Sequence, residues 1–159
     1  MPVTPIDLEH LRAAIALSRQ ASARGDEPYA AVLADGSGRV LATALNTQHS
    51  ERDCTGHAET NLLRDASRRS DRETLSQCTV YANGEPCAMC AGAIYWSNVP
   101  RVVYALPVAT MKAAAGAEAD ELLIGCREVL ARGMHAVEVL GPALEDEARA
   151  VLEAHHGRR

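Results

Sequence analysis

The sequence predicts an α/β protein, a three-layer α/β/α sandwich built on a mixed five-stranded sheet. Short runs of apolar and β-branched residues alternate with stretches of helical periodicity along most of the chain, which is typical of strand–helix–strand units. The first two strands instead follow one another directly about an Asp-Gly-Ser-Gly turn, which indicates an antiparallel hairpin. A hairpin that precedes strand–helix–strand units requires a sheet with both kinds of pairing and with helices on both faces.

The expected elements follow in order from the N-terminus. Residues 6–24 carry apolar side chains near helical spacing, with acids early and arginines late, and Gly25 ends this helix. Residues 29–46 form the hairpin. The remaining elements alternate: a helix at 56–69, a strand at 77–83, a helix at 87–98, a strand at 101–107, a helix over 121–133, a strand at 134–141 and a closing helix at 143–156. No repeat or linker interrupts them, so we expect one domain over residues 1–159.

The composition excludes several classes of protein. The chain has 159 residues, of which 47% are hydrophobic and 23% charged, a balance typical of globular proteins. Its longest apolar run, residues 88–96, is far shorter than the ~20 residues that a membrane span needs. Residues 1–15 lack the basic start and apolar run of a secretory signal. We therefore expect a cytoplasmic protein, without a membrane partner, whose five cysteines stay reduced.

The charge distribution argues against a nucleic-acid partner. The formal net charge is −5, whereas nucleic-acid binders concentrate Lys and Arg in a patch that displaces phosphate counterions. One basic cluster, residues 64–72, is interrupted by acids and is typical of a solvated helix end.

The motif "EPCAMC", residues 85–90, places two cysteines three positions apart at the start of a predicted helix. Cys87 and Cys90 therefore share one helix face, where both sulfurs can meet one centre, and the helix N-terminus favours thiolates. Taken alone, the pair is compatible with core packing, with a redox pair or with a metal site.

His57 favours the metal site, because it too begins a predicted helix and completes a set of one imidazole and two thiolates. Three such ligands are typical of a catalytic zinc that keeps its fourth position for water, and Glu59 is then a carboxylate beside that water. A rival set includes Cys54 as a fourth ligand. Four ligands close a zinc site and make it structural, which would leave Glu59 as an ordinary helix residue.

The segments "HAE" (57–59) and "EPCAMCAGAIYWS" (85–97) resemble the cytidine-deaminase superfamily of zinc hydrolases. Over residues 25–140 the chain is most similar to the guanine deaminase and nucleoside deaminase branch. The resemblance implies a Zn²⁺ ion held by His57, Cys87 and Cys90, and a homodimer. It also implies that Glu59 takes a proton from water and delivers it to the ring nitrogen beside the amino-bearing carbon. Glu85 is expected to shape the turn before Cys87.

The substrate contacts that the resemblance implies are Tyr29, Asn46, Ala58 and Glu118. Asp120 and Glu121 compete with Glu118 for the role of the acid that contacts the substrate's amino groups. The chain departs from the branch in three places: Tyr29 stands where relatives have Phe, Ala30 where they have Gly, and the C-terminus "EAHHGRR" lacks their aromatic tail.

The resemblance implies a zinc-dependent aminohydrolase of small nucleobases or nucleosides, with guanine, a related aminopurine or guanosine as the first choice of substrate. The alternatives within the enzyme class are cytosine or cytidine, an s-triazine, and tRNA adenosine. The tRNA branch typically carries a basic segment after the next strand, where this chain has the acidic-ended "PVATMKAAAGAEADE". Outside the enzyme class, the alternative is a non-catalytic zinc-stabilised interaction domain, which has no need for Glu59.

Overall fold

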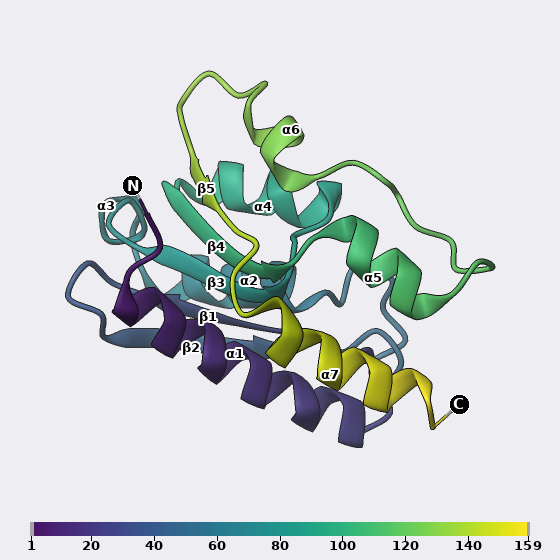
Figure 1. Ribbon diagram of the computed structural model, residues 1–159. Coiled ribbons are helices and arrows are strands. Elements are labelled where there is room, and N and C mark those ends of the chain that lie inside the picture. The colour runs from purple at the N-terminus through teal and green to yellow at the C-terminus, as the bar shows by residue number, and fades with distance from the viewer. Residues whose placement is uncertain (1, 159) are drawn as a thin grey trace.

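Residues 2–158, which the computed structural model describes, form a five-stranded mixed sheet with helices on both faces (Figure 1). The strands lie in the order β2–β1–β3–β4–β5, with bounds Ala30–Ala34 (β1), Val40–Leu45 (β2), Thr79–Gly84 (β3), Arg101–Leu106 (β4) and Glu138–Leu140 (β5). β1 pairs antiparallel with β2 and β3, whereas β3, β4 and β5 are parallel to one another. The predicted three-layer sandwich on a mixed sheet is confirmed.

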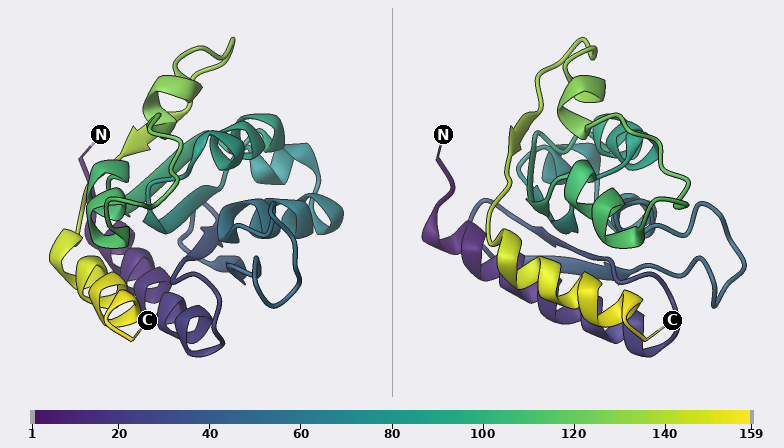
Figure 2. Two further views of the ribbon diagram at one scale, coloured as in Figure 1. Left: turned by 90° about the vertical axis from the view of Figure 1, so that its right-hand side faces the viewer. Right: turned by 45° about the vertical axis from the view of Figure 1, so that its right-hand side comes forward.

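The helices form one layer on each face of the sheet. α1 (Pro5–Ala23) and α7 (Glu145–His156) run side by side across one face (Figure 2). The other layer contains α2 (Ala58–Arg69), α4 (Ala88–Ser97) and α6 (Cys126–Leu130), with the short α3 (Arg72–Leu75) before β3; α5 (Val108–Ala115) packs against α7. Within the described residues, none of the helices combines the length and the apolar character that crossing a membrane requires.

An apolar core lies on each side of the sheet. Leu62 of α2 and Ile94 of α4 pack with Val80 on one side, and Leu11 of α1 and Leu152 of α7 pack on the other. The three inner strands β1, β3 and β4 are buried along almost their whole length because helices cover both faces of the sheet. Such strands are expected to be continuously apolar, as "AAVLA" and "VVYAL" are.

α1 is capped at its N-terminus and ends shortly before Gly25. Thr4 Oγ1 accepts a hydrogen bond from the Asp7 N–H, and the Asp7 carboxylate accepts one from the Thr4 N–H, which forms a capping box around Pro5. The chain leaves the helix through Gly25, whose φ of +87° is in the left-handed region that glycine adopts readily. The predicted end of this helix at Gly25 is thereby confirmed to within two residues.

The segment after β4 differs from the sequence prediction. α5 was not expected, and the predicted helix over 121–133 is confined to α6, because residues 117–125 are irregular. The last strand is also shorter than the predicted 134–141, since β5 pairs only with the first half of β4.

Candidate metal centre and active site

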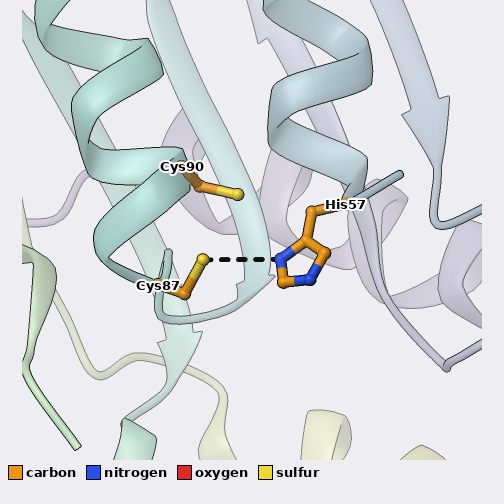
Figure 3. A group of neighbouring side chains, drawn as sticks. All are labelled: His57, Cys87 and Cys90. Atoms are coloured by element: carbon orange, nitrogen blue, oxygen red, sulfur yellow. Dashed lines mark hydrogen bonds between the residues drawn. The ribbon is translucent and has the colours of Figure 1, made fainter. Parts of the chain in front are cut away.

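Two helix starts that lie side by side bring three possible metal ligands together (Figure 3). His57 is the N-cap of α2, Cys87 is the N-cap of α4, and Cys90 lies in the first turn of α4. Their ligand atoms all lie within 4.8 Å of one another, and Cys87 Sγ is 3.4 Å from His57 Nδ1. Glu85 and Pro86 connect the end of β3 directly to Cys87.

The donor set fits zinc. One imidazole nitrogen and two sulfurs are the ligands that Zn²⁺ favours, and three protein ligands leave a fourth position open. Hydrogen bonds from Cys90 and then from His57 lower the pKa of Cys87, so one sulfur already has thiolate character. The hydrogen bond with Cys87 in turn raises the pKa of His57. His57, Cys87 and Cys90 are therefore in position to bind a metal ion, as the sequence predicts.

Cys54 stays outside the ligand group. Its exposed side chain lines the cavity beside the metal site, but among residues 2–158 the ligand atoms that cluster are those of His57, Cys87 and Cys90 alone. The four-ligand arrangement with Cys54 is therefore not formed, and the site has the open composition of a catalytic zinc rather than a closed structural one.

Glu59 lies in the first turn of α2, two residues after His57, and is 6% exposed. It lines the same cavity as His57 and Cys87. Burial raises the pKa of its carboxyl group above the ordinary value. A buried carboxyl group beside a zinc site can exchange protons with the reacting molecules without competition from bulk water.

The cavity beside the metal site has a volume of about 400 Å³ and holds three of the four substrate contacts that the sequence implies. Tyr29, Asn46 and Ala58 all line it. Gly84 lies under Tyr29, where a Cβ atom would approach Met111 Sδ to 2.6 Å and Tyr29 Cε1 to 3.0 Å. A larger residue at position 84 would therefore require the Met111 side chain or the Tyr29 ring to shift.

Asn46 is buried at the cavity wall and is already hydrogen-bonded. Its Oδ1 accepts from the Gln48 N–H at 3.0 Å, and its Nδ2 donates to Gln48 Oε1 at 2.9 Å. The first contact is an Asx turn, the ordinary role of Asn at a strand end. Gln48 also lines the cavity, so the amide groups of both residues lie at its wall. Sequence reasoning missed Gln48, although its position two residues after Asn46 is what an Asx turn requires.

Glu118 is exposed and does not line the cavity, whereas Asp120 and Glu121 do. α5 carries the chain away from the sheet as far as Gly116, and the return towards α6 brings residues 120–122 to the cavity. Burial, followed by repulsion from Cys87, raises the pKa of Glu121. The acids that line the cavity are thus two and three residues later than Glu118, the first choice from the sequence.

The charged side chains that line the cavity are mainly acidic. Glu27, Glu85, Asp120 and Glu121 line it together with Glu59. Among the described residues of its lining there is no Lys or Arg. Burial and the negative charges of Glu121, Glu27 and Glu59 raise the pKa of Tyr29, so its hydroxyl stays neutral. Glu27 was not expected from the sequence, because its position just before Pro28 carries no motif.

Comparisons with known proteins agree with this site. Residues 5–106 match the family described as the cytidine and deoxycytidylate deaminase zinc-binding region. A protein of Schizosaccharomyces pombe named "Probable cytosine deaminase" is 37% identical over 144 residues, which cover 89% of this chain and 87% of that protein. A tRNA-specific adenosine deaminase of Bacillus subtilis is 30% identical over 151 residues, covering 91% of this chain and 85% of that protein.

Among solved structures, the guanine deaminase of Nitrosomonas europaea superimposes with a TM-score of 0.79 at 26% identity, covering 98% of this chain and 86% of that chain. The family match spans more than half of the chain and includes His57, Glu59, Cys87 and Cys90. The chain therefore belongs to the cytidine and deoxycytidylate deaminase family and is a zinc-dependent deaminase.

Proposed function

We propose that this deaminase hydrolyses the amino group of a small uncharged nucleobase or nucleoside, with guanine or a related aminopurine as the preferred substrate. The observation that carries the proposal is the acidic cavity beside the metal ligands, with its lining carboxylates and no lining Lys or Arg among the described residues. A nucleotide or a tRNA would bring phosphate charges to this rim, where carboxylates repel them. A neutral base or nucleoside meets no such repulsion.

His57, Cys87 and Cys90 would hold the zinc ion, which when bound supplies a water of lowered pKa at neutral pH. Glu59 would accept a proton from that water and deliver it to the ring nitrogen next to the amino-bearing carbon. After the water oxygen has added to that carbon, Glu59 would take the second proton of this oxygen and pass it to the amino group, which leaves as ammonia while the carbonyl forms. One carboxylate would thus serve as base and then as acid. Tyr29 offers an aromatic face for stacking on the base.

The preference for an aminopurine rests on Glu121. The amino group at the 2-position of guanine is the one that the reaction removes, so the donors left for Glu121 are N–H groups of the ring, for which a carboxylate is the natural acceptor. A two-ring purine also reaches further from the reacting carbon than the single ring of cytosine does. The structural similarity to a guanine deaminase along nearly the whole chain supports the same choice.

Cytosine is the second candidate, since the S. pombe relative named as a probable cytosine deaminase is 37% identical along most of both chains. We also propose a homodimer, supported by the large apolar side chain of Trp96, which is 78% exposed at the end of α4. Sedimentation velocity of the wild type and of Trp96→Gln tests this assembly: the variant is expected to dissociate more readily.

Ammonia release by the zinc-loaded protein tests the substrate. The panel contains guanine, guanosine, cytosine, cytidine, an aminotriazine, the nucleotides GMP and dCMP, and a tRNA anticodon stem. We expect guanine or guanosine to give the highest specificity constant and each nucleotide to react more slowly than its own nucleoside. A nucleotide or tRNA as the best substrate contradicts the proposal, and cytosine as the best substrate replaces its first choice by its second.

A further inference from the structure

Glu85 connects two segments that are far apart in the sequence. Its Oε2 accepts a hydrogen bond from the Val108 N–H at 3.0 Å, and its Oε1 accepts one from the Cys126 N–H at 2.9 Å. Val108 is the first residue of α5, and Cys126 is the first residue of α6. One carboxylate, 9% exposed, therefore binds both ends of the segment 108–126.

The surroundings of Glu85 are built to hold this carboxylate in place. The Glu85 N–H donates to the Leu106 carbonyl at 2.7 Å, which fastens the residue to the end of β4. A Cβ atom on Gly125 would approach Glu85 Oε1 to 2.6 Å, so α6 can come this close only because that residue is glycine. The first N–H groups of a helix have no partner within it, and a carboxylate binds such donors with charge-assisted hydrogen bonds.

Between these two anchors the segment runs along the cavity, which Asp120, Glu121 and Leu122 line. In Figure 1 it is the long green connection between α5 and α6. Leu122 and Leu123 are both 66% exposed, so little packing fixes this part of the segment. Lys112 Nζ donates to the Ala117 and Ala119 carbonyls, but these contacts end before Glu121. The position of Glu121 therefore depends on where the ends of the segment are held.

We infer that Glu85 is a positioning residue, whose two hydrogen bonds to Val108 and Cys126 place the cavity-lining segment and its Glu121 carboxylate against the substrate. Neither side-chain hydrogen bond involves Cys87 or Cys90, so Glu85 acts on substrate binding rather than on the metal. The inference rests on the proposed function only in taking Glu121 as a substrate contact.

Glu85→Gln tests the role of the two bonds. An amide accepts from one of the two N–H groups, but its own NH₂ then faces the other, so one anchor is lost. The variant is expected to keep one zinc per chain. We expect its KM to rise about tenfold with kcat changed less than about threefold, because a buried donor loses its partner. Cleavage by the Glu-specific protease after Glu118 and Glu121 should also accelerate about tenfold.

Gly125→Ala approaches the same contact from the other side. Its Cβ atom displaces the Glu85 carboxylate, so it should give the same rise in KM and in cleavage. The double variant Glu85→Gln/Gly125→Ala should be no worse than either single variant, because both remove one interaction. Two controls match the substitutions: Gly36→Ala, whose Cβ atom makes only an ordinary contact in the hairpin turn, and Glu138→Gln, which breaks an ion pair with Arg101 far from the segment. Neither should change KM or cleavage at Glu118 and Glu121.

Each other outcome overturns the inference. Unchanged cleavage in Glu85→Gln shows that the carboxylate does not hold the segment. Faster cleavage with unchanged KM shows that the segment is held but does not bind substrate. If Glu85→Gln loses zinc and its kcat falls, Glu85 instead supports the connection to Cys87 and thereby the metal ligands. If Glu85→Gln loses stability but keeps wild-type kinetics, as expected for Glu138→Gln, the role of Glu85 is structural only. Failure of the proposed substrate would differ from all of these, since it appears in the wild type.

Discussion

At the scale of single residues, the site contains three possible metal ligands and a separate buried carboxyl group. His57, Cys87 and Cys90 present their ligand atoms to a common point, while Glu59 is buried beside them and lines the cavity. Each of these three residues must present a deprotonated atom to a metal. We propose Glu59 as the base and acid, because its carboxyl group is not a member of the ligand group.

Glu59→Gln separates chemistry from folding. Glutamine keeps the size and much of the hydrogen bonding of glutamate but cannot accept a proton. The variant should fold, bind one zinc and bind substrate, yet lose at least ~10²–10⁴-fold in turnover, the usual contribution of general acid–base catalysis. Steady-state ammonia release measures the loss, with the exposed Glu73→Gln of α3 as the control. Near-normal turnover would mean that another group carries the proton.

Glu121→Gln and Glu118→Gln form a matched pair of acids, one at the cavity and one outside it. Loss of the Glu121 carboxylate leaves a substrate N–H without its acceptor, which should lower kcat/KM for guanine by about tenfold or more. Glu118→Gln should be silent. Kinetics with guanine and with cytosine check the prediction, and equal effects of the two substitutions would count against Glu121 as the substrate contact.

At the scale of elements, the site is made from the ends of helices and strands. The starts of α2 and α4 provide the ligands, and the ends of β1, β2 and β3 provide Tyr29, Asn46 and Gly84 for the cavity. The side chains of Met111 and Tyr29 occupy the space into which a side chain at Gly84 would extend.

Gly84→Ala tests that packing. Its Cβ atom would lie 2.6 Å from Met111 Sδ and 3.0 Å from Tyr29 Cε1, so α5 or the tyrosine ring must shift. Overpacking of this kind lowers the free energy of unfolding by about 1–3 kcal/mol. Denaturant unfolding measures the change. Gly92→Ala is the control, because a Cβ atom there meets nothing within 4 Å; a Gly84→Ala variant as stable as this control would contradict the account.

The sequence predicts those elements whose pattern is local. The helix starts at His57 and Cys87 follow from motif and spacing, and both lie where the sequence places them. The segment after β4 could not be predicted, because the position of Glu121 depends on Glu85, a residue more than 30 positions earlier. No local sequence pattern predicts that contact. The acids at 118, 120 and 121 all resemble early residues of a helix, so the sequence does not show which of them faces the cavity.

At the scale of the whole molecule, Asp7 ties the first helix to the centre of the sheet. Its carboxylate accepts from Thr4 at the start of α1, from the Tyr81 hydroxyl at 2.9 Å, and from Arg101 at 2.7 and 2.9 Å. Burial alone would raise the pKa of Asp7, but the hydrogen bonds from Arg101, Thr4 and Tyr81 outweigh it and hold the pKa well below its usual range. Its contribution to stability is thus present above the unfolded-state pKa and is lost as the pH falls towards the folded-state pKa.

Asp7→Asn should therefore lower the free energy of unfolding by about 3 kcal/mol at pH 7, since it leaves Arg101 without its buried partner. The difference from the wild type should shrink by about 1.4 kcal/mol per pH unit below about pH 4, where the unfolded carboxylate is protonated. Urea unfolding between pH 7 and pH 3 follows both quantities. Asp65→Asn, which breaks an exposed pair with Arg69, is the control and should change stability little at any pH. A difference between Asp7→Asn and wild type that stays constant down to pH 3 would contradict the assignment.

The zinc content of Cys54→Ser and Cys87→Ser tests most directly whether this chain holds an open catalytic metal site. Both cysteines line the cavity, but only Cys87 belongs to the ligand group. Elemental analysis of the purified proteins should find one zinc per chain in the wild type and in Cys54→Ser, and almost none in Cys87→Ser. Loss of zinc from Cys54→Ser would show a closed four-ligand site with no position for water, and would contradict the assignment of this site to catalysis.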